Sequence, residues 1–256
     1  MNVKQEQLNR LYLEYLDRIL SDKEIFYKVN NFTFSSPLFI DLKVKNGNVS
    51  NKKHTLLFIG QQTKGWLNRD ERKNLDIRKK TEYLKALRKL YIEFNYGDRL
   101  EGQKYNGYLW QFQRPLIETV NEKNKDSFGL LWSNLMRIDE NQDKIDNKNT
   151  IEKIAYKNNE ILKKEIEIIR PDAIVFVTGC YYDWLLKKTF KDLTFYETDN
   201  KDLNLKKLAI LKSNFLPKLT FRTYHPRPLY QNRYLKNSRT KIIETIAEII
   251  MKELNN

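Results

Sequence analysis

The sequence predicts an α/β fold in which helices cover both faces of a central, mainly parallel four-stranded sheet, giving three αβα layers. Two observations lead to this prediction. Four short runs are continuously apolar, as strands buried on both faces are, and they span residues 54–60, 128–135, 173–179 and 219–224. Segments with helical spacing of apolar residues alternate with these runs, and such alternation is typical of strands connected in parallel.

The N-terminal part of the chain predicts one clear helix and one short strand. Residues 8–20 carry apolar side chains at a spacing of three to four positions, which is typical of a helix. Residues 37–44 predict the strand, and a turn-rich sequence follows it. We therefore expect residues 1–50 to form a helical extension packed on the core, and residues 51–256 to form the α/β domain.

The segments between the apolar runs follow from the same rules. Helical periodicity predicts helices over residues 75–94, 108–121, 151–169 and 239–254. Pro171 ends the third of these helices, since proline cannot donate a backbone hydrogen bond. Another short helix with Trp184 follows the third strand, and we expect Trp66, Trp132 and Trp184 to lie in the core. Residues 191–218 give no clear assignment.

The charge of the chain and its few cysteines and histidines restrict its function. Its 47 Lys and Arg exceed its 33 Asp and Glu, and a net charge of +14 favours a polyanionic partner such as a nucleic acid. AT-rich coding is an alternative explanation for part of this lysine content. A single cysteine, Cys180, excludes an internal disulfide and clusters of cysteine ligands. The two histidines are too few for a multi-histidine metal site, so we expect no metal and no cofactor.

The same composition predicts where the protein works. A lone cysteine is typical of a reducing compartment, so we expect a cytoplasmic, nucleoid-associated protein. No apolar run reaches the roughly 20 residues that cross a bilayer, so no membrane partner is expected. We expect a monomer.

Polar residues follow three of the four predicted strands. Ligands of parallel sheets bind beyond the carboxyl ends of the strands, and Gln62, Asn134 and His225 occupy such positions. Taken alone, Asn134 is more typical of a cap at a strand end, and His225 is ambiguous. The loop after the first strand is not a phosphate-binding P-loop, because no Gly-Lys-Ser/Thr follows Gly60.

The stretch around His225 has an unusual pattern of prolines. Pro226 and Pro228 follow the histidine at alternate positions, and each proline ring fixes φ. The pattern predicts a rigid loop that presents one imidazole and, at its tip, the exposed apolar side chain of Leu229.

Together these residues resemble the uracil-DNA glycosylase superfamily. The family's final motif, H-P-S-P-L-S, corresponds here to His225-Pro226-Arg227-Pro228-Leu229-Tyr230. Its first motif, G-Q-D-P-Y, corresponds to Gly60-Gln61-Gln62-Thr63-Lys64, and its middle strand, G-V-L-L-L-N, to Gly129-Leu130-Leu131-Trp132-Ser133-Asn134. Each motif is short. Their common order and spacing, over roughly residues 50 to 254, carry the resemblance.

The resemblance implies a role for each matching residue. Asn134 would bind the edge of a flipped pyrimidine through its carboxamide, which offers one donor face and one acceptor face. His225 would stabilise negative charge on the base O2 as the glycosidic bond breaks. Leu229 would wedge into the duplex where the base leaves the stack, and Arg227 would replace a serine that touches phosphate.

Further residues complete the expected site. Gly60, Gln61 and Lys64 would line the base pocket, and Tyr96, in a loop with two glycines, is placed to stack a base. Tyr230 and Arg233 would contact DNA next to the His225 motif.

Two departures from the family pattern lie in the first motif. Gln62 replaces the aspartate that orients the attacking water, and an amide can orient water but cannot accept a proton. Asp70, Glu71 and Asp76 are nearby in the sequence and could supply a carboxylate. Lys64 replaces an aromatic ring that excludes bases substituted at C5, so we expect a larger base.

The expected function is that of a monofunctional DNA glycosylase that leaves an abasic site. The expected substrate is a C5-modified pyrimidine, such as the glucosylated hydroxymethylcytosine of some phage DNA, and the expected role is defence against phages. Three alternatives remain open: a catalytically silent DNA-binding protein on the same frame, a uracil-excising repair enzyme, and a lyase that uses Lys64 as a Schiff-base nucleophile.

Overall fold

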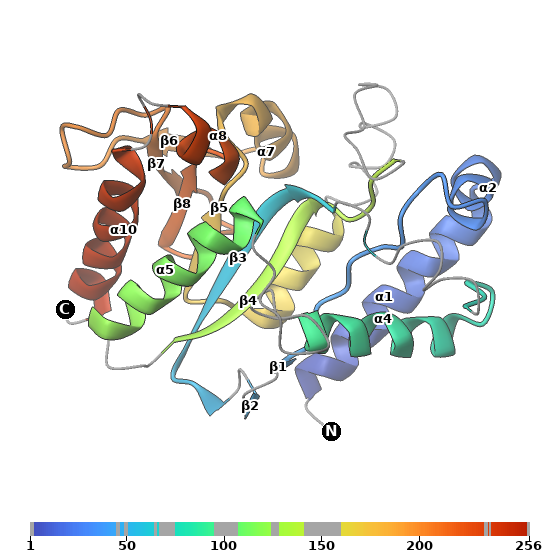
Figure 1. Ribbon diagram of the computed structural model, residues 1–256. Helices are drawn as coiled ribbons and strands as arrows, with labels where there is room; N and C mark the ends of the chain where they lie inside the picture. Colours follow the sequence, from blue (N-terminus) through green and yellow to red (C-terminus); the bar gives the residue numbers. More distant parts are fainter. Residues whose placement is uncertain are drawn as a thin grey trace. The chain divides into compact units, whose positions relative to one another are not determined.

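The computed structural model of the chain has an α/β fold with a six-stranded mixed sheet (Figure 1). The residues that the structure describes are 3–44, 47–48, 51–63, 66, 75–94, 107–123, 128–140, 160–232, 235 and 237–254. The chain divides into two compact units. The first unit comprises Met1–Leu42, Gln62–Glu93 and Ser133–Ile169, and the second comprises Lys43–Gln61, Phe94–Trp132 and Arg170–Asn256.

The sheet is built from the four predicted strands and two further ones. Its strand order is β4-β3-β5-β8-β7-β6. The bounds are β3 (His54–Gln62), β4 (Phe128–Met136), β5 (Ala173–Phe176), β6 (Thr194–Tyr196), β7 (Leu208–Lys212) and β8 (Leu219–Thr223). β3 pairs with β5 in parallel, and β5 pairs with β8 in parallel, whereas β8, β7 and β6 pair antiparallel.

The prediction of an α/β fold is therefore confirmed, but the sheet has six strands where four were expected, and it is mixed. Residues 191–218, which gave no assignment, contribute the two antiparallel strands β6 and β7 at one edge. β6 alternates exposed, half-buried and exposed side chains, so it lacks the continuous apolar run that marks a buried strand.

Helices of the second unit cover one face of the sheet. α5 (Tyr108–Lys123) and α10 (Ser238–Leu254) lie side by side, and α10 also packs on β8 (Figure 1). The ring of Phe112 in α5 lies 6.2 Å from that of Phe58 in β3, measured between centroids. The unit also holds the short antiparallel pair β1 (Lys43–Val44) and β2 (Gly47–Asn48), the 3-10 helix η3 (Cys180–Tyr182), α7 (Asp183–Thr189) and α8 (Pro226–Gln231).

The first unit is mainly helical. It contains α1 (Val3–Ser21), α2 (Lys23–Asn30), the helical residues 160–169, and most of α4 (Lys80–Phe94). Asp22 caps α2 by accepting a hydrogen bond from the Ile25 N–H at 3.2 Å. The sequence predicts an extension over residues 1–50, whereas in the structure Met1–Leu42 shares this unit with two later segments of the chain.

The segment expected to form a strand over residues 37–44 is buried but is not a strand until Lys43. The Leu38 N–H donates to the Arg137 carbonyl at 3.0 Å, and side chains accept from two later N–H groups of the segment. The Ile40 N–H donates to the Tyr12 hydroxyl at 3.1 Å, and the Leu42 N–H donates to Gln5 Oε1 at 2.8 Å. This strand prediction is wrong because apolar burial alone does not identify the hydrogen-bond partner.

Candidate functional site

Three parallel strands of the second unit end at one edge of the sheet. Ile59, Phe176 and Arg222 occupy the same level of β3, β5 and β8. Beyond this level, the Val177 N–H donates to the Ile59 carbonyl at 2.8 Å, and the Gly179 N–H donates to the Thr223 carbonyl at 2.9 Å. The segments after the strands therefore begin at a common edge, where parallel sheets bind ligands.

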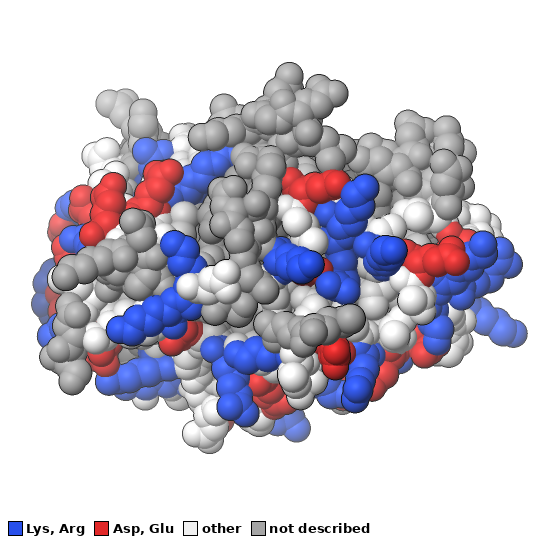
Figure 2. Space-filling model, turned by 90° about the horizontal axis from the view of Figure 1, so that it is seen from below, with Lys and Arg blue, Asp and Glu red and all other residues white. Residues whose placement is uncertain are grey.

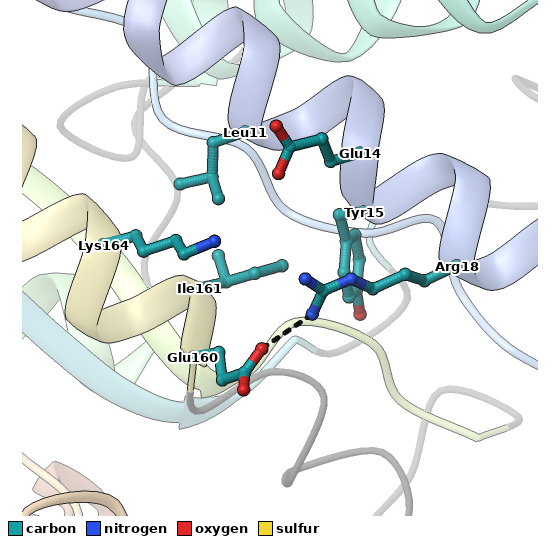
Figure 3. Close-up of a pocket in the computed structure, with 7 residues that line it drawn as sticks. All are labelled: Leu11, Glu14, Tyr15, Arg18, Glu160, Ile161 and Lys164. Atoms are coloured by element: carbon teal, nitrogen blue, oxygen red, sulfur yellow. Dashed lines mark hydrogen bonds and ion pairs between the residues drawn. The ribbon is translucent and has the colours of Figure 1, made fainter.

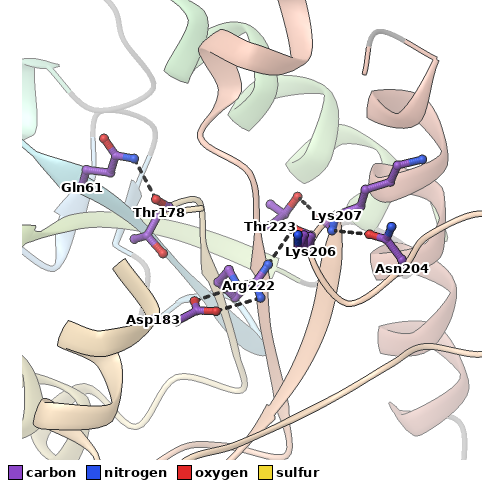
Figure 4. Close-up of polar contacts among 8 residues, drawn as sticks. All are labelled: Gln61, Thr178, Asp183, Asn204, Lys206, Lys207, Arg222 and Thr223. Carbon is purple, nitrogen blue, oxygen red and sulfur yellow. Dashed lines mark hydrogen bonds and ion pairs between the residues drawn. The ribbon is translucent and has the colours of Figure 1, made fainter. Parts of the chain in front are cut away.

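Side-chain and backbone contacts tie two of these segments to the turn after β5. Gln61 donates through Nε2 to the Thr178 carbonyl at 2.7 Å (Figure 4). Gly179 has a positive φ of 72°, which favours glycine, and a Cβ at this position would lie 3.7 Å from the His225 backbone nitrogen. Gly60, Gln61 and His225 are thus brought to one edge, and the amide nitrogen of Gln61 already has a structural partner.

His225 is the N-cap of a helix rather than part of a rigid loop. Pro226–Gln231 form α8, with proline in its first turn. Prolines are tolerated there because the first-turn N–H groups have no partner within the helix. The prediction of a loop stiffened by Pro226 and Pro228 is therefore wrong, because the same fixed φ angles also suit the start of a helix.

The capping contact favours one tautomer of the imidazole. His225 Nδ1 accepts a hydrogen bond from the Arg227 N–H at 3.3 Å. A neutral imidazole whose Nδ1 accepts carries its proton on Nε2. The half-buried ring can then offer an Nε2–H donor.

The apolar residue expected at the tip of this segment is buried. Leu229 is 0% exposed, whereas Arg227 and Pro228 are exposed. The prediction of an exposed Leu229 is wrong, because in α8 the side chain three positions after the first proline points into the protein. In this conformation Leu229 offers no wedge to DNA. Arg227 is the exposed cationic residue of the motif.

A hydrogen-bonded and aromatic network holds α8 to its neighbours. Arg227 Nε donates to Gln231 Oε1 at 3.0 Å, and Gln231 Nε2 donates to the Tyr108 hydroxyl at 3.2 Å. The Tyr230 ring lies 5.4 Å from the Tyr108 ring, and the Arg239 guanidinium lies over Tyr230 at 4.4 Å. Burial raises the pKa of Tyr230. Tyr230 is thus partly enclosed, and the predicted DNA-binding residue Arg233 lies outside the described residues.

Gln62 and Asn134, the other two predicted catalytic residues, belong to the first unit. Asn134 lies near the end of β4 and is only 2% exposed. Gln62 is half-buried, and its Oε1 atom is buried without a hydrogen-bond partner among the described residues. An amide oxygen in this state can accept a hydrogen bond from water.

Several predicted residues cannot be placed. Lys64 and Tyr96 lie outside the described residues, as do Asp70 and Glu71. Asp76 is described, and its carboxylate accepts from Arg78 Nε at 2.9 Å. Hydrogen bonds from the Arg78 side chain and backbone lower the pKa of Asp76. Its carboxylate therefore already has a cationic partner.

A buried arginine at the strand ends was not found by sequence reasoning. Arg222 in β8 is 1% exposed, and it binds both carboxylate oxygens of Asp183 in α7, Nε to Oδ1 at 3.0 Å and Nη2 to Oδ2 at 3.1 Å (Figure 4). Its Nη1 donates to the Lys206 carbonyl at 2.8 Å. Burial raises the pKa of Asp183, and Arg222 opposes this shift. Only an arginine within an otherwise apolar strand could have signalled this pair.

Two of the three tryptophans expected in the core are buried, and one is not. Trp66 is 6% exposed and Trp132 is 4% exposed, which confirms the prediction for them. Trp184 is 37% exposed, so its assignment to the core is wrong. The neighbouring Tyr181 is 85% exposed.

Two further features of the described surface are the distribution of its charges and a shallow groove. Lysine and arginine alternate with acidic residues on the face drawn in Figure 2, so the excess positive charge does not gather into one patch there. A shallow groove of the first unit lies between α1 and residues 160–169, bridged by the Arg18–Glu160 ion pair at 2.8 Å (Figure 3). None of the predicted site residues that the structure describes lines this groove.

The described residues hold neither a membrane-spanning helix nor a metal-binding cluster. No helix in this part of the chain is both long enough and apolar enough to cross a membrane. Nor do three or more His, Cys, Asp or Glu side chains gather there in a way that could hold a metal ion.

Comparison of the chain with models of known protein families finds no match, and no curated protein matches it either.

Proposed function

We propose that this protein is a DNA glycosylase that flips a pyrimidine out of DNA and hydrolyses its N-glycosidic bond, leaving an abasic site. One observation supports this most directly. His225 lies at the carboxyl edge of parallel strands, and its Nδ1 accepts the Arg227 N–H, which leaves Nε2 as the donor of a neutral imidazole. A fixed donor of this kind stabilises an oxyanion that forms as a leaving group departs.

In the proposed reaction the C1′–N1 bond breaks first and its electron pair leaves with the base. His225 donates from Nε2 to the base O2, where negative charge grows. The resemblance gives Asn134 the role of binding the base edge, through the donor and the acceptor of its carboxamide. Water then adds its hydroxyl to C1′, and its proton goes to the departed base or to solvent, so no electrons are gained or lost.

We assign to Gln62 the orientation of the attacking water. Its buried Oε1 has no protein partner among the described residues, so it can accept a hydrogen bond from that water. An amide cannot take the proton. The proposal therefore requires a base that leaves readily, or slower chemistry than a carboxylate would give. The same substitution favours the second candidate function, a DNA-binding protein without excision activity.

The proposed substrate is a C5-modified pyrimidine, such as the glucosylated hydroxymethylcytosine of phage DNA, and the proposed role is defence. Lys64 supports this choice, because it stands where the resemblance places an aromatic ring that excludes C5 substituents. A lysine side chain is flexible and can turn away from a larger base.

The test is an excision assay on DNAs that differ in one base: uracil, hydroxymethylcytosine or glucosylated hydroxymethylcytosine. We expect alkali-sensitive sites in the C5-modified DNAs, and a loss of about 10²- to 10³-fold in rate with His225→Ala. His54→Asn is the matched control. His54 is the other histidine of the chain, and it pairs with Asp172 at 3.1 Å, at the start of β3.

The outcomes separate the alternatives. Excision of uracil with no excision of either modified cytosine would contradict the proposed substrate. DNA binding without abasic sites in any of the three DNAs would favour the silent binding protein. Equal loss of rate in His225→Ala and His54→Asn would contradict the role of His225.

A further inference from the structure

Two exposed aromatic side chains follow β5 at the edge of the sheet where His225 lies. Tyr181 is 85% exposed and Trp184 is 37% exposed. They are three positions apart in a nearly continuous helical segment, η3 followed by α7, so they lie on the same side of it. Lys187 and Lys188, in the next turn, are also exposed. We call Tyr181, Trp184 and Lys188 the aromatic strip.

The aromatic strip begins close to His225. Gly179, two residues before Tyr181, donates its N–H to the Thr223 carbonyl at 2.9 Å, and its Cβ position lies 3.7 Å from the His225 nitrogen. Burial raises the pKa of Tyr224, and the neighbouring Cys180 and Tyr181 raise it further. Tyr181 is therefore near the residue that directly precedes His225.

The aromatic strip is held in a fixed orientation. Leu185 and Leu186 are 1% and 0% exposed, so they anchor the inner side of α7. Asp183, at the start of α7, binds Arg222 through both carboxylate oxygens. One charged hydrogen bond, from Arg222 Nη2 to Asp183 Oδ2 at 3.1 Å, and the close approach of Nε to Oδ1 at 3.0 Å hold the start of α7 against β8. The outer side of α7, with Trp184, is thereby turned away from these anchors.

The chemistry of the strip indicates its partner. Exposed aromatic rings beside lysines can stack on bases while the lysines meet phosphates. Cores of protein–protein interfaces are depleted of lysine, so a protein partner fits this composition less well. Stacking also needs a base with a free face, and paired bases inside a duplex do not offer one.

We infer that the aromatic strip binds unpaired DNA, with Tyr181 and Trp184 stacking on bases next to the nucleotide at His225. The inference rests on DNA as the substrate of the proposed function, but it does not depend on base excision. It assigns to this protein a preference for single-stranded or locally opened DNA.

The test is fluorescence anisotropy with a fluorescein-labelled dT12 oligonucleotide and, separately, a 12-base-pair duplex. Stacking on an aromatic side chain contributes enough that Tyr181→Ala or Trp184→Ala should raise the Kd for dT12 about 5- to 100-fold. Tyr181→Phe should bind like the wild type, because it keeps the aromatic face. Tyr27→Ala is the matched control, since Tyr27 is 67% exposed on α2 of the other unit.

A salt titration separates stacking from charge. Lys188→Ala should reduce the slope of log Kd against log salt by about the amount that one phosphate contact contributes. Tyr181→Ala should leave that slope unchanged while shifting the whole line. Thermal melting by circular dichroism shows whether each variant is folded.

Three results would overturn the inference: dT12 affinity unchanged in both alanine variants, an equal loss of affinity for the duplex, or loss in Tyr181→Phe as large as in Tyr181→Ala. Measuring excision and dT12 binding on the same variants keeps the two proposals apart, because His225→Ala tests excision, with an expected loss of about 10²- to 10³-fold in rate, whereas Tyr181→Ala and Trp184→Ala test dT12 binding. Strip-dependent dT12 binding without excision would contradict only the proposed function. Excision with unaltered binding in the strip variants would contradict only this inference.

Discussion

The two units each contain an arginine paired with a carboxylate, and the two pairs differ in their surroundings. In the first unit Arg137 pairs with Glu165, and both are 0% exposed. In the second unit Arg222 is also buried, but the side chain of its partner Asp183 is 24% exposed. The first pair is closed off from water, whereas the second is open to water at the edge of the sheet.

The other hydrogen-bond partners of each pair indicate its structural role. Arg137 Nη1 also donates to the Leu38 carbonyl at 3.1 Å, and Glu165 Oε1 accepts from the Tyr12 hydroxyl at 2.7 Å. This network joins four separated parts of the chain within the first unit, at Tyr12, Leu38, Arg137 and Glu165. Arg222 instead joins β8 to α7, the helix that contains the partly exposed Trp184. We call Arg137–Glu165 the closed pair and Arg222–Asp183 the open pair. The closed pair stabilises the core of the first unit, and the open pair orients the exposed side of α7.

The closed pair should give the largest effect when it is broken. Glu165→Leu leaves the buried Arg137 charge without its carboxylate and should lower the free energy of unfolding by about 3–5 kcal/mol. Urea denaturation followed by circular dichroism measures this change.

Two controls test whether the lone charge causes the loss. Arg137→Met combined with Glu165→Leu should recover most of the stability, because both charges are removed together. Glu160 lies on the same helix as Glu165 and forms an exposed ion pair with Arg18 of α1. Glu160→Leu breaks this exposed pair and should change the free energy of unfolding by less than about 1 kcal/mol. A double variant as unstable as Glu165→Leu would contradict this explanation.

Breaking the open pair should cost less stability and more function. Asp183→Asn removes a charged hydrogen-bond acceptor from Arg222, but water can replace part of it, so we expect a loss of about 2 kcal/mol. The same variant should weaken dT12 binding, since α7 loses its ion pair with Arg222. Urea denaturation and anisotropy measure the two effects on one preparation.

Asp202→Asn is the control for this prediction. Asp202 pairs with Lys241 in the same unit, and the side chain of Asp202 is 65% exposed. This variant should leave both stability and dT12 binding close to the wild type. Equal weakening of dT12 binding in both variants would show that α7 does not depend on its anchor.

The sequence identifies the strands that are buried along their whole length, and misses those that are not. β4 is buried at every position, so its residues form the continuous apolar run that predicts a strand. β6 is exposed at two of three positions and carries no such signal. Residues 37–42 have the burial of a strand, but the N–H groups of Ile40 and Leu42 donate to side chains of α1 rather than to a neighbouring strand.

The candidate site divides along a similar line. The positions of Gln62 and Asn134 near strand ends follow from local pattern, and the structure places them there. The burial of Leu229 does not follow, because alternate prolines suit both a stiff loop and the first turn of a helix. The Arg222–Asp183 pair joins residues 39 positions apart, and no short sequence motif predicts it.

The smallest expected effect concerns the hydroxyl of the closed network. Tyr12→Phe removes the donor to Glu165 and the acceptor of the Ile40 N–H, and should lower the free energy of unfolding by about 1 kcal/mol near neutral pH. Burial, together with the Glu165 carboxylate, raises the pKa of Tyr12 well above its ordinary value. Above about pH 10 the unfolded tyrosine loses its proton while the folded one keeps it, so wild-type stability falls as pH rises.

Tyr12→Phe lacks this contribution, so its stability should fall less steeply, and the gap to the wild type should narrow between about pH 9 and pH 11. Urea midpoints measured across that range test the prediction. Tyr27→Phe, at an exposed tyrosine of the same unit, should run parallel to the wild type. A Tyr12→Phe curve that also runs parallel would mean that the closed network admits enough water at high pH for Tyr12 to titrate in the folded protein. The contrast between a closed and an open pair would then rest on the two arginines alone.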